Sequence, residues 1–271
     1  MSSLCSINGL SQWLRLLLGL SVIFGLFQWS AGALASNRGE AGLIVGLLVV
    51  SATIAAERLL FGQRVLAAAR TLGLGAPRAK GLFVVVGIGV VLVSIVYVFA
   101  QATGASLGPF PSWISLIPGL FAQAGVAEEI LFRGYLFGHL RRGRSFWRAA
   151  TISMLPFVGV HLFLFFTMPW PIALAAVLLS VALSFPLAHL FEVAGATIWA
   201  PALLHFVIQG TVKVVVVSGD GSWAFPLVWM AASGLVPWLS LFVARRRRGT
   251  TCEPRHPEPT SSVSLSAKRL P

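Results

Sequence analysis

Long, uninterrupted apolar runs constrain the fold of this chain more than any other feature. A helix that crosses a hydrocarbon core of about 30 Å needs roughly 20 apolar residues. Transmembrane β-barrels show alternating apolar and polar residues instead, whereas the runs here are continuous. The sequence therefore predicts an all-α, polytopic membrane bundle of about eight helices, near residues 12–35, 41–57, 81–101, 113–138, 148–167, 171–189, 195–217 and 224–244.

The low content of charged residues excludes a water-soluble domain of this size. Only 10% of the 271 residues are charged and 57% are hydrophobic, whereas a soluble domain carries about 25% charged residues. The two cysteines, Cys5 and Cys252, lie at opposite ends of the chain. They predict neither a disulfide framework nor a metal site.

The net charge of +12 comes mainly from Lys and Arg residues between the apolar runs and after the last one. The positive-inside rule explains this distribution without a nucleic-acid partner, because cytoplasmic loops are enriched in these residues. If both termini are cytoplasmic, the basic segments 58–80, 141–148 and 245–248 all lie inside, while the external loops carry little beyond Arg38, Glu40, Lys213 and Asp220. The predicted partner is thus the lipid bilayer, in a bacterial inner (cytoplasmic) membrane.

The chain divides into a membrane domain, residues 1–248, and a tail, residues 249–271. The tail is rich in Pro, Ser and Thr and cannot bury a core, so it is predicted to be disordered and cytoplasmic. Arg15 and the small residues at 31–35 also resemble a secretory signal with its cleavage site. We prefer an uncleaved first helix, because seven further spans already commit the chain to the membrane.

Two adjacent acids inside a span indicate a functional site, because a charged group there costs about 2.5–3.5 kcal/mol. Glu128 and Glu129 are two of only eight acidic residues. Arg133 follows Glu129 by four residues, so these two side chains can pair on one helix face. Glu128 is rotated by about 100°. A structural ion pair therefore explains Glu129 and Arg133 but leaves Glu128 without a role.

Two histidines, His161 and His205, also lie inside spans. Phe157 precedes His161 by four residues and Gln209 follows His205 by four, so each pair shares a helix face. Glu128 and both histidines lie thirteen residues inward from charges that mark the cytoplasmic ends of three spans. This spacing corresponds to about 20 Å of helix. We therefore expect the three side chains to meet near the middle of the bilayer.

A carboxylate and two imidazoles at one depth are compatible with two mechanisms of hydrolysis. In the first, Glu128 is the general base, and the histidines orient water and the developing charge. In the second, His161, His205 and a glutamate such as Glu128 hold a divalent metal, with zinc as the candidate, whose bound water attacks. The zinc-protease pattern H-E-x-x-H is absent. Metal ligation is therefore compatible with the sequence but not required by it.

Three motifs, in order, resemble those of one protease family. The segment Glu128-Glu129-Ile-Leu-Phe-Arg133 resembles the EExxxR motif of the CPBP (also ABI, CAAX protease self-immunity) intramembrane proteases, which are related to the type II CAAX prenyl endopeptidases. Phe157-Val-Gly-Val-His161 matches the family's FxxxH motif, and His205-Phe-Val-Ile-Gln209 resembles its HxxxN motif. The resemblance covers about residues 113–217, with each motif on its own predicted helix.

The resemblance implies a role for each of these residues. Glu128 is the expected catalytic base, His161 positions the water, and His205 with Gln209 stabilises the oxyanion. Glu129, Arg133 and Phe157 are the expected supporting residues. The sequence departs from the family at Gln209, where Asn is usual. This moves the amide by one methylene, and displacements near 1 Å can cost about a hundredfold in rate.

The leading hypothesis is an intramembrane endopeptidase that cleaves a membrane-anchored protein or peptide. The resemblance implies a prenylated protein, a leader or a C-terminal sorting segment as the substrate. The alternative is a non-catalytic bacteriocin-immunity or scaffold protein that keeps the motifs and acts by binding. A transporter with a proton relay is a third hypothesis, but the two halves show no clear internal repeat.

Overall fold

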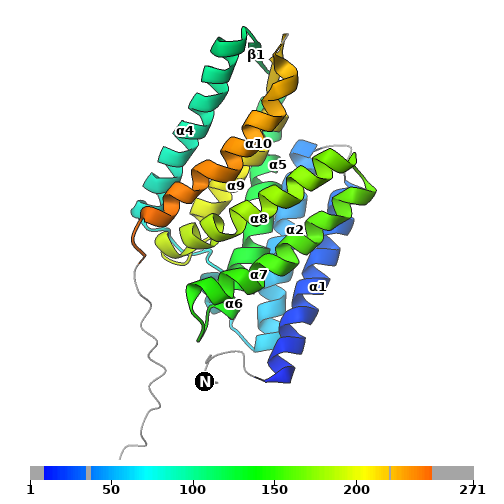
Figure 1. Cartoon of the computed structure of the whole chain (residues 1–271). Coiled ribbons are helices and arrows are strands. Elements are labelled where there is room, and N and C mark those ends of the chain that lie inside the picture. Colours follow the sequence, from blue (N-terminus) through cyan, green and yellow to red (C-terminus); the bar gives the residue numbers. More distant parts are fainter. Residues whose placement is uncertain (1–8, 35–37, 220, 246–271) are drawn as a thin grey trace, which may run out of the picture.

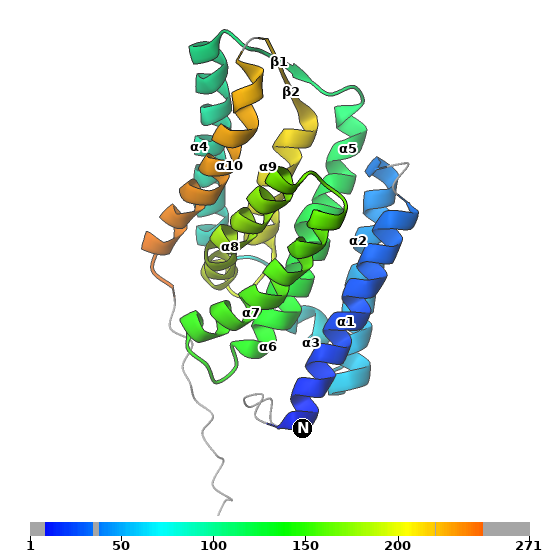
Figure 2. The same ribbon diagram turned by 45° about the vertical axis from the view of Figure 1, so that its right-hand side comes forward.

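The computed structural model describes residues 9–34, 38–219 and 221–245. The long helices lie side by side in a bundle (Figures 1 and 2). They are α1 (Leu10–Ala33), α2 (Arg38–Phe61), α4 (Ala79–Thr103), α7 (Phe146–His161), α8 (Trp170–Val193), α9 (Trp199–Val214) and α10 (Phe225–Leu235). Short helical elements complete the bundle: α3 (Val65–Thr71), α5 (Trp113–Leu120), α6 (Gly138–Leu140) and the 3₁₀ segments Leu162–Phe166, Ser222–Ala224 and Val236–Phe242.

Within the described ranges, seven helices are long and apolar enough to cross a membrane. They correspond to seven of the eight predicted spans, so the chain is an all-α integral membrane protein. The remaining predicted span, 195–217, contains only α9, a helix of 16 residues. At 1.5 Å per residue α9 extends about 24 Å, which is shorter than a typical hydrocarbon core.

The helix in the predicted span 195–217 is shorter than predicted at both ends. At the start, α8 finishes in a turn in which Gly195 and Ala196 have positive φ angles of 89° and 63°, and the Ala196 N–H donates to the Phe191 carbonyl at 2.8 Å. At the end, the chain becomes the strand β2 (Val215–Ser218), which pairs antiparallel with β1 (Ser106–Pro109). Three consecutive valines in β2 favour this extended backbone.

The fourth span is one continuous helical path that carries the predicted acidic pair. It runs from Trp113 to Leu140, compared with the predicted 113–138. Between α5 and α6 it contains two π-helical segments, Phe121–Ala127 and Ile130–Phe137. Pro118 lies inside α5 and has no N–H to donate. Glu128 and Glu129 occupy the junction between the two wide segments, and π-helical turns are frequent at functional sites.

Small residues allow α2 to lie directly against this path. Gly42 and Gly46 are four residues apart on α2, and a Cβ atom at Gly42 would collide with the backbone of Gly119. A Cβ atom at Gly46 would lie 2.9 Å from the carbonyl oxygen of Ala122. Such close backbone approach is typical of helix pairs in membranes. It fixes the position of the segment that leads into Glu128.

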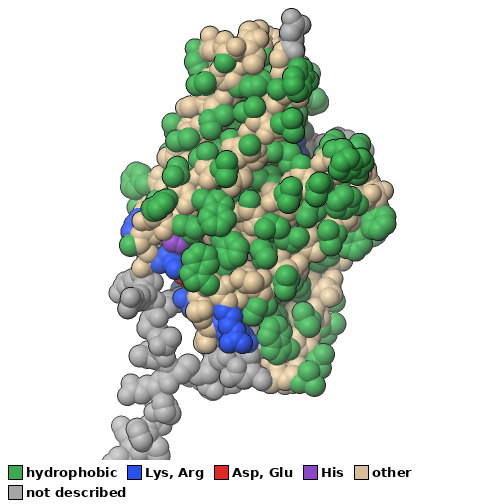
Figure 3. All heavy atoms as spheres, viewed as in Figure 1, with side chains coloured by type: hydrophobic (Ala, Val, Ile, Leu, Met, Phe, Trp, Pro, Cys, Tyr) green, Lys and Arg blue, Asp and Glu red, His purple; other side chains and the backbone are tan. Residues whose placement is uncertain are grey.

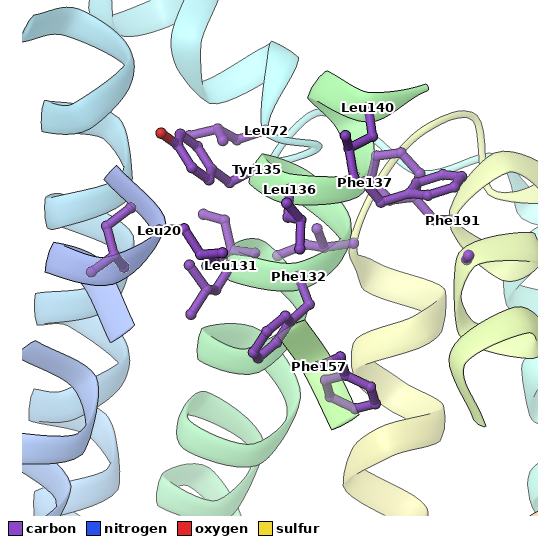
Figure 4. Close-up of a cluster of buried hydrophobic side chains, with 14 of the residues drawn as sticks. Leu20, Leu72, Leu131, Phe132, Tyr135, Leu136, Phe137, Leu140, Phe157 and Phe191 are labelled. Atoms are coloured by element: carbon purple, nitrogen blue, oxygen red, sulfur yellow. The ribbon is translucent and has the colours of Figure 1, made fainter. Parts of the chain in front are cut away.

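Two hydrophobic clusters flank the centre of the bundle. The first surrounds the segment Ile130–Phe137 and includes Phe157 of α7 (Figure 4). The second joins α4, α8, α9 and α10 and includes Leu204 and Ile208 of α9. His205 follows Leu204 on α9 and is buried. The histidine therefore lies where the two clusters approach one another.

Basic side chains gather at one end of the bundle. In Figure 3 the flank of the molecule is largely hydrophobic, and the visible Lys and Arg side chains lie toward the lower end, opposite the β1–β2 sheet of Figure 1. This distribution is that of a membrane protein with one strongly basic face. Which side this face occupies in the cell stays a prediction. Asp220, residues 246–248 and the predicted tail, 249–271, fall outside the described residues.

Candidate active site

The two neighbouring glutamates have different environments. The Glu128 side chain is 15% exposed, whereas the Glu129 side chain is fully buried. They point in different directions because they are consecutive residues of one helical path. Only Glu128 is thus accessible enough to meet a water molecule, and Glu129 is available for internal contacts.

Glu129 holds two groups from the protein interior. Its Oε1 atom accepts a hydrogen bond from Arg133 Nη1 at 3.0 Å, which is the ion pair that the sequence predicts. The same oxygen lies 2.8 Å from Nδ1 of His205. A buried carboxylate needs such charged or polar partners. Glu129 therefore neutralises Arg133 and fixes the orientation of the His205 ring.

A chain of polar contacts connects Glu128 to α9. Nε2 of Gln209 lies 3.4 Å from Oε1 of Glu128 and 2.8 Å from Nε2 of His205. Nε2 of His205 is 3.6 Å from Oε2 of Glu128. Lys213 Nζ donates to Oε1 of Gln209 at 3.2 Å. Glu128, His205 and Gln209, which the sequence places on two separate spans, are thus in one cluster.

These contacts indicate the tautomer of His205. Because Nδ1 faces a carboxylate oxygen, it carries the proton and donates to Glu129. Nε2 is then the acceptor of the Gln209 amide. The ammonium of Lys213 lies on the other side of the Gln209 amide and must face the amide oxygen, because an ammonium can only donate. Both contacts therefore give the same orientation of the Gln209 amide. The amide N–H₂ group of Gln209 is therefore the donor that faces Glu128.

His161 lies beside this cluster without bonding to it. Its Nδ1 atom is 2.7 Å from the Phe157 carbonyl oxygen and donates to it, so Nε2 is the acceptor nitrogen. In the described part of the chain His161 makes no hydrogen bond or ion pair with Glu128, His205 or Gln209. The structure thus places His161 within electrostatic range of Glu128 and His205, without a direct bond to either.

Phe157 is the link between the two histidines and the buried ion pair. Its ring centroid is 4.9 Å from that of His161 and 6.4 Å from that of His205. The Arg133 guanidinium carbon lies 4.1 Å from the Phe157 ring centroid, within the range of a cation–π contact. The aromatic residue of the second motif therefore packs α7 onto the path that carries the glutamates.

The predicted metal ligands do not form a metal-binding group in this structure. Among the described residues, no three His, Cys, Asp or Glu side chains are placed to hold an ion. The Nε2 lone pair of His205 accepts from the Gln209 amide, and that lone pair is what a metal would require. In this arrangement of the described residues the amide of Gln209 occupies the position that an ion would need at His205.

Two polar features, one in the site and one elsewhere in the bundle, were not identified from the sequence. The sequence assigns Lys213 to an external loop, but it lies in the last turn of α9 and contacts Gln209. Its spacing of four residues from Gln209 was the available signal. The second feature is a buried pair, His139 Nε2 and Glu57 Oε1, 2.6 Å apart. No local spacing joins those residues, which are 82 positions apart.

A family model described as type II CAAX prenyl endopeptidase Rce1-like matches residues 109–211. Over these residues the chain is similar to that family. The matched segment contains all three motifs, so the resemblance seen in the sequence is confirmed for this part of the chain. No curated protein and no solved structure matches the chain.

The Rce1-like segment runs from β1 to α9 and contains every residue of the cluster except Lys213. At the level of the family it indicates a CAAX-type intramembrane protease, which is a hydrolase. The helices α1, α2, α4 and α10 lie outside the match. They cover the segment and provide the buried surface on which it packs.

Proposed function

We propose that the protein is an intramembrane endopeptidase in which Glu128 activates a water molecule to cleave a membrane-anchored protein. The observation that carries this proposal is the cluster of a partly exposed carboxylate, Glu128, with the amide of Gln209 and the ring of His205. A partly exposed acid inside a membrane span is costly, and an internal ion pair does not account for it.

In this mechanism the Glu128 carboxylate removes a proton from water while the oxygen attacks the scissile carbonyl carbon. The carbonyl electron pair moves to oxygen and forms an oxyanion. The tetrahedral intermediate then collapses, the C–N bond breaks, and protonated Glu128 returns the proton to the leaving amine. One water is consumed and two chain ends form. A positioned general base of this kind contributes about a hundredfold to ten-thousandfold in rate.

The Gln209 amide is the group available to stabilise the oxyanion. Its N–H₂ faces Glu128, and preorganised donors aimed at a developing charge are among the largest contributions to catalysis. His205 holds this amide from one side, and Glu129 holds His205. His161, with its acceptor nitrogen at Nε2, orients the second hydrogen of the water.

Lys213 acts on the same amide from the opposite side. Its ammonium donates to the Gln209 oxygen, which polarises the amide and strengthens its N–H donors. It also restricts the longer side chain of Gln209 to one orientation. Lys213 is therefore a positioning residue that compensates for the additional methylene relative to Asn.

The direct mechanism is favoured over a metal-dependent one by the position of the Gln209 amide on His205. The two mechanisms give opposite responses to chelation. The direct mechanism predicts full activity after dialysis against a strong zinc chelator. Loss of activity that is restored by zinc would establish the metal mechanism instead.

The substrate class follows from the location of the site. Glu128 lies on a helical path long enough to span the membrane, so the substrate must itself reach the bilayer. We propose a prenylated protein, a leader peptide or a C-terminal sorting segment, in a bacterial inner membrane. The family match supports the first of these most directly, because its name refers to prenylated CAAX proteins.

The test is processing in native membranes. We compare the wild type with Glu128→Gln, His161→Ala and His205→Ala by quantitative proteomics of the chain ends of membrane proteins. Glu40→Gln, at an exposed acid in the first turn of α2, is the matched control. Loss of one set of cleavage products in the three variants, with retention in the control, supports the protease. Unchanged processing and phenotype in Glu128→Gln would instead indicate a scaffold or immunity protein.

A further inference from the structure

A cavity of about 250 Å³ lies at the basic end of the bundle, away from the acidic cluster. It is formed where the end of α3, the start of α6 and the turn between α8 and α9 meet. Figure 2 shows α3 and α6 at the same end of the molecule as the beginning of α1. The lining includes Arg70, Thr71, Arg142, Phe191, Gly195 and Ala196. We call it the α3–α6 cavity.

We propose that the α3–α6 cavity binds a phosphate group, supplied by an anionic membrane lipid. Two arginines line it, one from α3 and one from the turn after α6, and none of the lining residues is acidic. Arginine guanidinium groups bind phosphate through parallel, charge-assisted hydrogen bonds. The Thr71 hydroxyl adds a neutral donor at the same wall. The charge and the donors together fit a polyoxygen anion.

One arginine is fixed in place by the protein interior. Arg142 Nη1 lies 3.3 Å from Nδ1 of His139, whose Nε2 is 2.6 Å from the fully buried carboxylate of Glu57. Nδ1 is thus the acceptor, and the Arg142 guanidinium is oriented before a ligand arrives. Preorganisation of this kind lowers the entropy lost on binding.

The other arginine is not required to complete its helix. The carbonyl groups of Ala68, Ala69 and Arg70 at the end of α3 accept hydrogen bonds from the backbone N–H groups of residues 72–74. Among the described residues, no carboxylate forms an ion pair with Arg70. Its exposed guanidinium at the cavity therefore serves neither a helix end nor a protein partner.

The surroundings favour lipid as the source of the phosphate. The seven-residue helix α3 is too short to cross a membrane, and its apolar Val65 and Leu66 are 49% and 66% exposed beside Arg64 and Arg70. Exposed apolar and basic residues on one short helix are typical of an element at the headgroup level. Basic pockets between membrane helices bind anionic headgroups. Arg245 belongs to a different place, against Glu192 and Phe146.

The test uses the full-length protein in detergent, with native mass spectrometry of bound lipid. The probes are phosphatidylglycerol, phosphatidylcholine and inorganic phosphate, each added alone. We expect retention of phosphatidylglycerol over phosphatidylcholine, and about fivefold weaker binding for Arg70→Gln and for Arg142→Gln. Arg64→Gln, which removes an exposed arginine of the same loop outside the cavity, is the matched control and keeps wild-type binding.

Three results would overturn the proposal. Equal lipid binding by wild type and Arg70→Gln would show that the α3–α6 cavity is not the binding site. An equal loss of binding in all three variants would show that general surface charge, and not the cavity, attracts the lipid. Binding of inorganic phosphate without phosphatidylglycerol overturns the lipid source. Arg142→Gln also breaks the contact with His139, so the melting temperature of each variant is recorded. If Arg142→Gln proves to be unfolded, the variant at the exposed Arg70 alone tests the proposal.

Discussion

The contact between Lys213 and Gln209 gives the most specific prediction for catalysis. Removing the ammonium with Lys213→Met breaks the hydrogen bond of 3.2 Å to the Gln209 oxygen. The Gln209 N–H₂ group then loses its polarising partner while its contacts with Glu128 and His205 remain. We expect a slower reaction in a protein that folds and binds substrate normally.

The size of the effect follows from the environment of the bond. Hydrogen bonds to charged groups contribute about 1.5–3 kcal/mol when buried, and partial solvent screening of half-buried Lys213 lowers this range to about 1–2 kcal/mol. That corresponds to a fall in kcat of about fivefold to thirtyfold. The KM stays near the wild-type value, because the amide meets the oxyanion only in the transition state.

A double-mutant cycle measures whether Lys213 acts through Gln209. Cleavage is followed in proteoliposomes for wild type, Lys213→Met, Gln209→Ala and the double variant. If the lysine acts through the amide, Lys213→Met has little further effect once Gln209 is replaced by Ala. Lys213→Arg, which keeps the charge, is the matched control and loses less activity. Additive losses in the double variant, or a Lys213→Met enzyme of wild-type rate, would refute the reasoning.

Three further predictions concern packing, buried charge and metal. Gly42→Ala should destabilise the protein by about 1–3 kcal/mol through overpacking against Gly119, whereas Gly25→Ala, in open space on α1, leaves the melting temperature unchanged. His139→Ala leaves the carboxylate of Glu57 buried without its partner and should lower the free energy of unfolding by about 3 kcal/mol or more. Replacing both residues with leucine should lower it by less. Thermal unfolding in detergent measures the stability of both variants. Dialysis against a zinc chelator should leave the cleavage rate unchanged, and a loss reversed by zinc contradicts the direct mechanism.

The parts of the site that share a helix were predictable from the sequence. The ion pair between Glu129 and Arg133 follows from a spacing of four residues, and so does the shared face of His205 and Gln209. The membrane class followed from the apolar runs, since the hydrocarbon thickness fixes the length of a spanning helix. These features depend only on local geometry.

Contacts between distant segments were not predictable in the same way. The bond between His205 and Glu129 joins residues 76 positions apart, and it depends on how α9 packs on the glutamate helix. The shortness of α9 depends on the pairing of β2 with β1, more than one hundred positions earlier in the chain. Equal depth in the bilayer suggested that His161 would join Glu128. His161 does lie within electrostatic range of Glu128 and His205. Depth, however, does not determine hydrogen-bond partners, and Nδ1 of His161 donates to the Phe157 carbonyl.

The most direct test of the central claim is cleavage in H₂¹⁸O by purified protein in liposomes, with the substrate found by the proteomic comparison. Wild type and Glu128→Gln are compared in single-turnover reactions, and the new carboxyl end is analysed by mass spectrometry. The account predicts one ¹⁸O atom from water in that carboxyl group and a rate about a hundredfold to ten-thousandfold lower for Glu128→Gln. Cleavage by Glu128→Gln at the wild-type rate would contradict it.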